Sequence, residues 1–169
     1  MSSDVTSLAN DMMRNPVTVS TTPPASISTQ IDQKVLFVEP GNKGSLLVEI
    51  LKGKDVQRAL VFTRTKHRAD RVSRYLRSHG ISADAIHSNK SQNARQQALA
   101  GFDRGRIRVL VATDIVARGI DVDGISHVIN YEMPNDAASY VHRIGPTAPA
   151  GAPGTGISPC GADEVSPFK

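Results

Sequence analysis

The chain has 169 residues, 39% of them hydrophobic, which is enough to bury the core of one compact domain. Its formal net charge of +4 favours an anionic partner. The single cysteine, Cys160, excludes an internal disulfide and fits a reducing compartment. The N-terminus has no basic segment leading into an apolar one, and no apolar run approaches the roughly 20 residues of a membrane span. We therefore expect a cytoplasmic protein that does not enter a membrane.

The first thirty residues differ in composition from the rest. Residues 20–28 are rich in serine, threonine and proline and cannot pack a core, so we expect a linker there. Ahead of it, Leu8, Met12 and Met13 suit one helical turn, and residues 17–19 suit a short strand. We expect residues 1–30 to be separate from a domain at 31–165, with 166–169 as a tail.

From residue 35 onward, short β-branched runs alternate with amphipathic stretches. Ala69, Val72 and Leu76 recur at helical spacing and predict a helix over 65–79, which Gly80 is placed to end. Ser91 is placed to cap another helix, closed by the residues at 103–105. Alternating strands and helices predict an α/β fold with a mostly parallel sheet. The expected strands are 35–38, 59–62, 83–87, 109–111 and 128–131.

Two features of these helices have plain structural explanations. The stripe of Arg68, Arg71, Arg74 and Arg77 is expected to be a solvated helix face. Residues 41–45, Gly-Asn-Lys-Gly-Ser, resemble a phosphate loop only superficially, because the spacing is wrong, and we expect a turn.

Two sequence blocks carry the functional signal. Residues 112–122 read Ala-Thr-Asp-Ile-Val-Ala-Arg-Gly-Ile-Asp-Val, and residues 142–145 read His-Arg-Ile-Gly. The apolar run 109–111 precedes the first block, so Thr113, Asp114 and Arg118 should emerge at the carboxyl end of a buried parallel strand, where open sheets bind ligands. Together the blocks resemble motifs V and VI of the DEAD-box RNA helicases.

This resemblance implies the second, C-terminal RecA-like domain of such a helicase, a three-layer α/β fold with helices on both faces of the sheet. It covers roughly residues 30–160 and is closest to the bacterial RhlE-like group. In the family, a segment like residues 1–30 closes the first RecA-like domain. The chain has no phosphate loop, no Asp-Glu-Ala-Asp block and no Cys/His set with metal-ligand spacing. We expect it to hold no metal by itself, and to use ATP and Mg²⁺ only as part of a two-domain protein.

The resemblance also assigns residues to RNA. Residues 60–66 are similar to motif IV, and residues 87–95 resemble the His-Gly-x-x-x-Gln-x-x-Arg block, with Ser88 in place of glycine. A helix opening at Ser91 would aim free N–H groups at a phosphate, although the same residues also suit a plain capped helix. By resemblance, Thr113 binds an RNA phosphate and Asp114 organises contacts across the cleft between the domains. The expected RNA-binding residues are Thr63, Arg64, Asn89, Lys90, Gln92, Arg95, Thr113 and Asp114.

On the ATP side, the resemblance implies that Arg118 acts across the domain cleft and that Asp121 reaches the ribose and the water near the γ-phosphate. His142 and Arg143 belong to the same side. Motif VI continues in the family with two arginine fingers, but Pro146 and Pro149 stand at those positions, so no catalytic residue is intact. The alternatives are errors in the sequence, because single base changes convert arginine and leucine codons to proline, or a catalytically inactive helicase half.

Further departures from the family's sequence pattern, after residue 150, are expected to affect folding. Pro153 and Pro159 are expected to interrupt the family's last strand, because proline is poorly tolerated inside a sheet. By the same resemblance, we expect the family's closing helix to be missing after Glu164. An exposed edge strand could then drive dimers.

The leading hypothesis is the C-terminal half of an ATP-dependent RNA helicase, supplying half of an RNA groove and half of an ATP site and inactive alone. Its partners would be RNA, held by backbone contacts, and the N-terminal RecA-like domain. The alternatives are a non-catalytic RNA-binding or interaction module that lost its arginine fingers, and a DNA helicase of the same superfamily.

Overall fold

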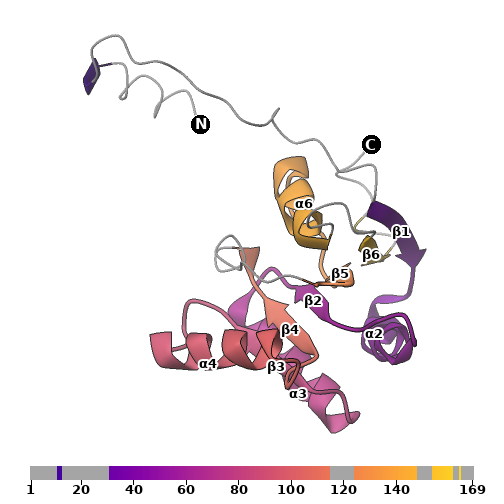
Figure 1. Cartoon of the computed structure of the whole chain (residues 1–169). Coiled ribbons are helices and arrows are strands. Elements are labelled where there is room, and N and C mark those ends of the chain that lie inside the picture. Colours follow the sequence, from indigo (N-terminus) through magenta and orange to yellow (C-terminus); the bar gives the residue numbers. More distant parts are fainter. Residues whose placement is uncertain (1–10, 13–30, 115–123, 148–153, 162–163, 165–169) are drawn as a thin grey trace.

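The computed structural model describes residues 11–12, 31–114, 124–147, 154–161 and 164 (Figure 1). Strands and helices alternate, as the sequence predicted. The strands are β1 (Ile31–Phe37), β2 (Ala59–Phe62), β3 (Ala83–Ile86), β4 (Val109–Ala112), β5 (His127–Asn130) and β6 (Gly154–Cys160). The helices are α2 (Lys43–Lys52), α3 (Lys66–Ser78), α4 (Gln92–Asp103) and α6 (Ala137–Ile144), with 3₁₀ turns η1 (Pro40–Asn42) and η2 (Gly145–Thr147).

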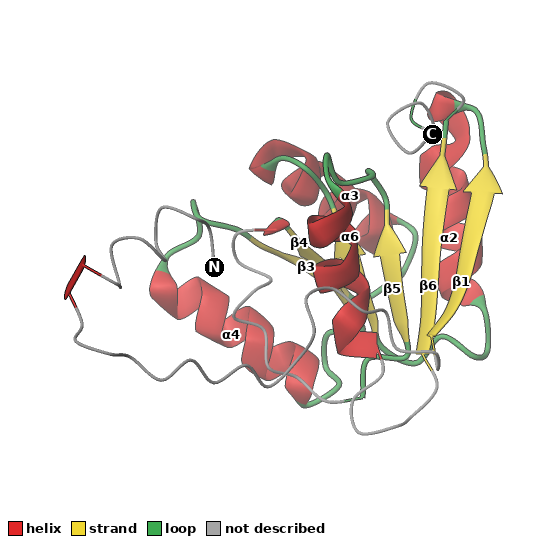
Figure 2. Cartoon of the chain, turned by 90° about the horizontal axis from the view of Figure 1, so that it is seen from above, coloured by secondary structure: helices red, strands yellow, loops and turns green. Residues whose placement is uncertain are grey.

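All strand pairs recorded in the sheet are parallel, in the order β1-β6-β5-β2-β4-β3. Figure 2 shows β5, β6 and β1 running in one direction, with α2 on one side of them and α6 on the other. Because the strands share a direction, their carboxyl ends meet at a single edge of the sheet. The predicted three-layer RecA-like architecture is confirmed.

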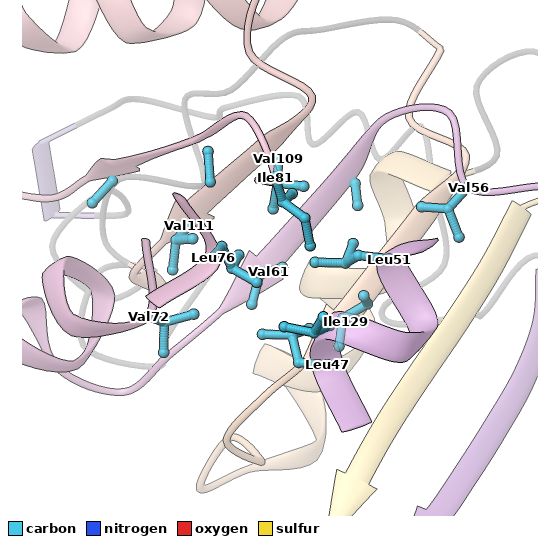
Figure 3. Close-up of a cluster of buried hydrophobic side chains, with 14 of the residues drawn as sticks. Leu47, Leu51, Val56, Val61, Val72, Leu76, Ile81, Val109, Val111 and Ile129 are labelled. Atoms are coloured by element: carbon cyan, nitrogen blue, oxygen red, sulfur yellow. The ribbon is translucent and has the colours of Figure 1, made fainter. Parts of the chain in front are cut away.

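The core is divided by the sheet into two layers. Neighbouring strand residues point to opposite faces, so Val61 packs toward α2 and α3, whereas Leu60 and Phe62 pack toward α4 and α6. The central strands β2, β4 and β5 are buried along their whole length, as parallel strands covered on both faces must be. Figure 3 shows the first layer, in which α2 contributes Leu47 and Leu51, α3 contributes Val72 and Leu76, and the strands contribute Val61, Val109, Val111 and Ile129.

The helix ends follow the sequence signals. Thr65 caps α3 by accepting a hydrogen bond from the Arg68 N–H, and Ser91 caps α4 by accepting one from the Ala94 N–H. After α3, Gly80 takes a φ of +77°, a conformation that favours glycine. The turn predicted for residues 41–45 is confirmed only for 41 and 42, which lie in η1, and was wrong for 43–45, because α2 already begins at Lys43.

The interruption predicted for the last strand was wrong at Pro159. Strand β6 pairs with β1 along its length, with Leu36 opposite Pro159. The N–H groups of a parallel strand alternate between its two neighbours, and the Thr155 N–H donates to Ser126 on the β5 side. The Pro159 nitrogen therefore also faces β5, beyond Ile157, the last residue paired with that strand. The missing N–H removes no recorded ladder bond, while Pro153 lies outside the described residues.

Strands β1 and β3 lie at the two edges of the sheet. Among the described strands, β1 pairs only with β6, and on it Val35 is 52% and Phe37 74% exposed. The predicted linker at 20–28 and the tail at 166–169 lie outside the described residues, so those boundaries stay predictions. Among the helices of the described segments, none is long and apolar enough to cross a bilayer.

Candidate nucleic-acid interface

The carboxyl edge of the sheet gathers polar side chains from four neighbouring strands. Thr63 follows β2, His87 follows β3, Thr113 follows β4 and Glu132 lies two residues after β5. The capped first turns of α3 and α4 begin at the same edge, because each follows its strand after a short turn. Their unpaired N–H groups add partial positive charge there, which suits an anionic ligand.

The turn after β2 holds the predicted motif IV residues. Thr63 is fully buried, and its hydroxyl donates to the Thr65 carbonyl at 3.2 Å. Thr65 in turn caps α3, so the Thr63 side chain shapes the turn from within. The Arg64 side chain is exposed, while its backbone N–H donates to Glu132 Oε2 at 2.9 Å. Of the two predicted contacts, Arg64 is the one whose side chain is open to a phosphate.

Residues 87–95, which resemble the family's His-Gly-x-x-x-Gln-x-x-Arg block, lie on the rim formed by β3 and α4. Asn89 accepts a hydrogen bond from Lys66 Nζ at 3.0 Å, which connects this block to the start of α3. Gln92 accepts from Arg95 Nη2 at 2.5 Å within the first turn of α4. The structure thus brings Asn89, Gln92 and Arg95 to one rim, beside the N-terminus of α4 that the sequence predicted as a phosphate site.

Lys90 forms an ion pair with Asp70, the acidic residue of α3. Its ammonium lies 3.2 Å from Asp70 Oδ1, and His87 Nε2 lies 3.1 Å from Asp70 Oδ2. Partial burial works to raise the pKa of Asp70, but the contacts with His87 and Lys90 outweigh it and hold that pKa below its usual range. Asp70 was not predicted from the sequence, since one acid within an arginine-rich helix carries no distinctive signal.

The strongest connection at the edge joins the two diagnostic motifs. Arg143, only 2% exposed, points its Nε at Asp114 Oδ1 at 2.5 Å and its Nη2 at Asp114 Oδ2 at 2.9 Å. Its Nη1 donates to the Glu132 carbonyl at 2.6 Å and to Asn130 Oδ1 at 3.3 Å, and its guanidinium lies 5.1 Å from the centre of the Phe62 ring. All three guanidinium nitrogens of Arg143 donate hydrogen bonds, so this side chain connects the ends of β4 and β5.

Glu132 connects this fork to the motif IV turn. It is 9% exposed, its carboxylate holds the Arg64 N–H and lies 3.4 Å from Arg68 Nε, and its own N–H donates to the Phe62 carbonyl at 3.3 Å. Glu132 was not predicted from the sequence. Its place directly after a buried strand, at the edge where the other site residues emerge, was the available signal.

The remaining predicted residues are distributed as follows. Thr113, 9% exposed, lies beside Asp114 at the end of β4, and His142 is exposed on α6. Pro146 lies in η2, whereas Arg118, Asp121 and Pro149 lie outside the described residues. Within the described part of the chain, no group of three His, Cys, Asp or Glu side chains is placed to hold a metal ion.

Comparison with known proteins identifies the family. Residues 42–151 match the helicase conserved C-terminal domain, which is more than half of the chain. The Escherichia coli DEAD-box protein SrmB, solved with regulator of ribonuclease activity A, is 38% identical, with a TM-score of 0.76 over 80% of each chain.

Two longer relatives align over nearly the whole chain. A DEAD-box protein from the hyperthermophile Methanococcus jannaschii is 34% identical, with a TM-score of 0.78 over 99% of this chain and 45% of its own. Saccharomyces cerevisiae Dbp5 carrying L327V, bound to RNA and ADP BeF3, is 26% identical, with a TM-score of 0.84 over 98% of this chain and 45% of its own. The chain therefore spans less than half of these two relatives. It belongs to the DEAD-box RNA helicases, as their helicase C-terminal domain.

Proposed function

We propose that this domain forms one wall of an RNA groove and one wall of an ATP site in a two-domain, ATP-dependent RNA helicase. The observation that carries the proposal is the fork between the buried Arg143 and the partly exposed Asp114, which holds motif VI against motif V next to Thr113. Dbp5 of similar fold is bound to RNA and ADP BeF3, which supports both ligands for the complete protein.

RNA would lie across the carboxyl edge, with its phosphates near Arg64, Asn89, Thr113 and the start of α4. These are backbone contacts, so binding would be insensitive to sequence and would weaken steeply with salt. A preference for RNA over DNA would require contacts to the 2′-hydroxyl.

ATP and Mg²⁺ would be held mainly by the N-terminal domain, with Arg118, Asp121 and His142 facing the nucleotide from this side. Proline at 146 and 149 cannot supply the cationic fingers that neutralise charge on the transferring phosphoryl group. We therefore propose that the chain alone binds RNA weakly and hydrolyses nothing.

The test joins the chain to the N-terminal RecA-like domain of a DEAD-box relative. RNA-stimulated ATP turnover is compared between the joined protein, its Pro146→Arg/Pro149→Arg variant and a Pro23→Arg/Pro24→Arg control with the same added charge. The finger variant should gain about 10³-fold or more in turnover, and the control should gain nothing. No gain, with RNA binding intact, would contradict the helicase reading and favour the non-catalytic RNA-binding module.

RNA binding itself is tested by fluorescence anisotropy of a labelled ten-residue oligouridine with the joined protein. Thr113→Val removes the hydroxyl at nearly constant shape and should weaken RNA binding several-fold. Thr155→Val makes the same change near the amino end of β6, away from the proposed RNA contacts, and should leave RNA binding unchanged. Equal affinity for the matching DNA would support the alternative of a DNA helicase.

We further propose membership of the bacterial RhlE-like group, from the motif V resemblance, and a cytoplasmic location, from the single unpaired Cys160.

A further inference from the structure

A groove crosses the face of the domain that carries α2 and α3. It consists of two adjoining cavities of about 270 and 210 Å³, which share Pro40, Arg68 and Tyr131 as lining residues. The larger cavity lies on the α2 and α3 side of the sheet, whereas the smaller one includes Arg64 and Glu132 of the proposed RNA rim. None of the contacts described for motifs V and VI involves the larger cavity.

The larger cavity has an apolar floor. Leu47 of α2 and Val72 of α3, both buried, form its base, and the Tyr75 ring forms a wall. The space depends on Gly44, since a Cβ at that position would lie 3.1 Å from Tyr75 Cε1. A cavity of this size and lining suits one apolar side chain of a partner.

The charges around the groove are not balanced. Lys43 pairs with Glu164, and Arg68 lies 3.4 Å from a Glu132 oxygen. Arg71 is exposed and has no acidic partner among the described residues.

Tyr131 stands close to Arg71. Both residues line the larger cavity, and the Tyr131 hydroxyl can donate a hydrogen bond. Burial raises the pKa of Tyr131. Arg71 and the Tyr131 hydroxyl together suit a carboxylate held at the mouth of the apolar cavity.

We propose that this groove binds an acidic peptide segment of a protein partner. One apolar side chain fills the cavity over Leu47 and Val72, and a neighbouring carboxylate meets Arg71 and Tyr131. A peptide fits better than RNA because a backbone of phosphates would leave the apolar floor of the larger cavity, formed by Leu47 and Val72, unfilled. The proposal is independent of ATP hydrolysis and extends the domain's role to partner docking.

The probe is a phage-displayed library of random dodecapeptides selected on the whole chain. Enriched peptides should place an acidic residue beside an aromatic or aliphatic one, and Arg71→Glu should weaken their binding at least tenfold. Arg74→Glu, the same change one turn away on α3 and outside both cavities, should leave binding within about twofold. Replacing the peptide's acidic residue with lysine should restore binding to the Arg71→Glu protein, which a merely misfolded variant could not do.

The proposal would be overturned by no enrichment, by equal losses in Arg71→Glu and Arg74→Glu, or by no rescue with the lysine peptide. A loss of oligouridine affinity in Arg71→Glu, with peptide binding unchanged, would overturn it in favour of an extended RNA path. A failure of the joined protein to hydrolyse ATP would leave the peptide result unaffected, so the two proposals fail separately.

Discussion

Glu132 accepts a hydrogen bond from the backbone N–H of Arg64 at 2.9 Å, and so fastens the turn after β2 to the segment after β5. The backbone carbonyl of the same glutamate accepts from Arg143. One residue thus touches the proposed RNA-contacting turn through its side chain and the motif VI arginine through its main chain. Its side chain can be changed without removing the bond to Arg143.

Glu132→Ala should lower the free energy of unfolding by about 1–3 kcal/mol, because the Arg64 N–H loses its acceptor in a partly buried position. Glu132→Gln keeps an acceptor oxygen and should cost less. Urea unfolding measures both, with Glu49→Ala on the exposed side of α2 as the control. If Glu132→Ala were as stable as the control, the hydrogen bond would not hold the turn in solution.

Arg143→Met should cost about 3–5 kcal/mol, because it leaves the Asp114 carboxylate and the Glu132 carbonyl without their shared donor. Arg143→Lys should recover only part of this loss, since an ammonium cannot form the fork. His142→Ala, one residue earlier and exposed, is the matched control. A double-mutant cycle with Asp114→Asn should give strong coupling, and additive losses would contradict the fork.

Proline at 159 should be tolerated, whereas proline two residues earlier should not. Pro159→Ala should change the free energy of unfolding by about 1 kcal/mol, from lost burial alone. Ile157→Pro should cost at least about 3 kcal/mol more than Ile157→Ala, because its N–H faces β5 within the paired ladder. Equal costs of proline at both positions would show that the β6 register differs from the one described.

Stability should fall between pH 7 and pH 5 partly through His127. Burial lowers the pKa of His127, although the nearby Asp55 opposes the shift. The unfolded chain therefore takes up the proton more readily, and stability present above the ordinary pKa near 6.5 is lost as the pH falls toward the lower folded value. Urea unfolding at both pH values should show a smaller fall for His127→Gln than for the wild type. The exposed His67→Gln should fall as the wild type does, and a fall in His127→Gln equal to that of the wild type would remove His127 as the cause.

The fold could be predicted because its signals are local. Alternating β-branched runs, Thr65 and Ser91 at helix starts and Gly80 at a helix end each act within a few residues. The path of β6 could not be predicted from Pro159, because the cost of a proline in a strand depends on which neighbour its nitrogen faces. That direction is set by the register against β5, which is a long-range property.

The candidate site was predicted only where short motifs mark it. Thr113 and Asp114 emerge at the carboxyl edge as expected, but the resemblance gave Arg143 a role beside ATP without showing its burial in a fork with Asp114. Glu132 and Asp70 were missed because their partners are distant in sequence. Arg64 and Glu132 come together only when β2 and β5 are neighbours in the sheet.

The order of the strands in the sheet also constrains the order in which the domain can fold during synthesis. Among the described strands, β1 comes first in the sequence and pairs only with β6, which comes last, so β1 has no partner among them until β6 has left the ribosome. Closing so long a loop is slow, and meanwhile Val35 and Phe37 offer an apolar edge to other chains. The β2-β4-β3 and β2-β5 pairs can form earlier. We therefore expect β1 to join last, and aggregation during synthesis to begin at this strand.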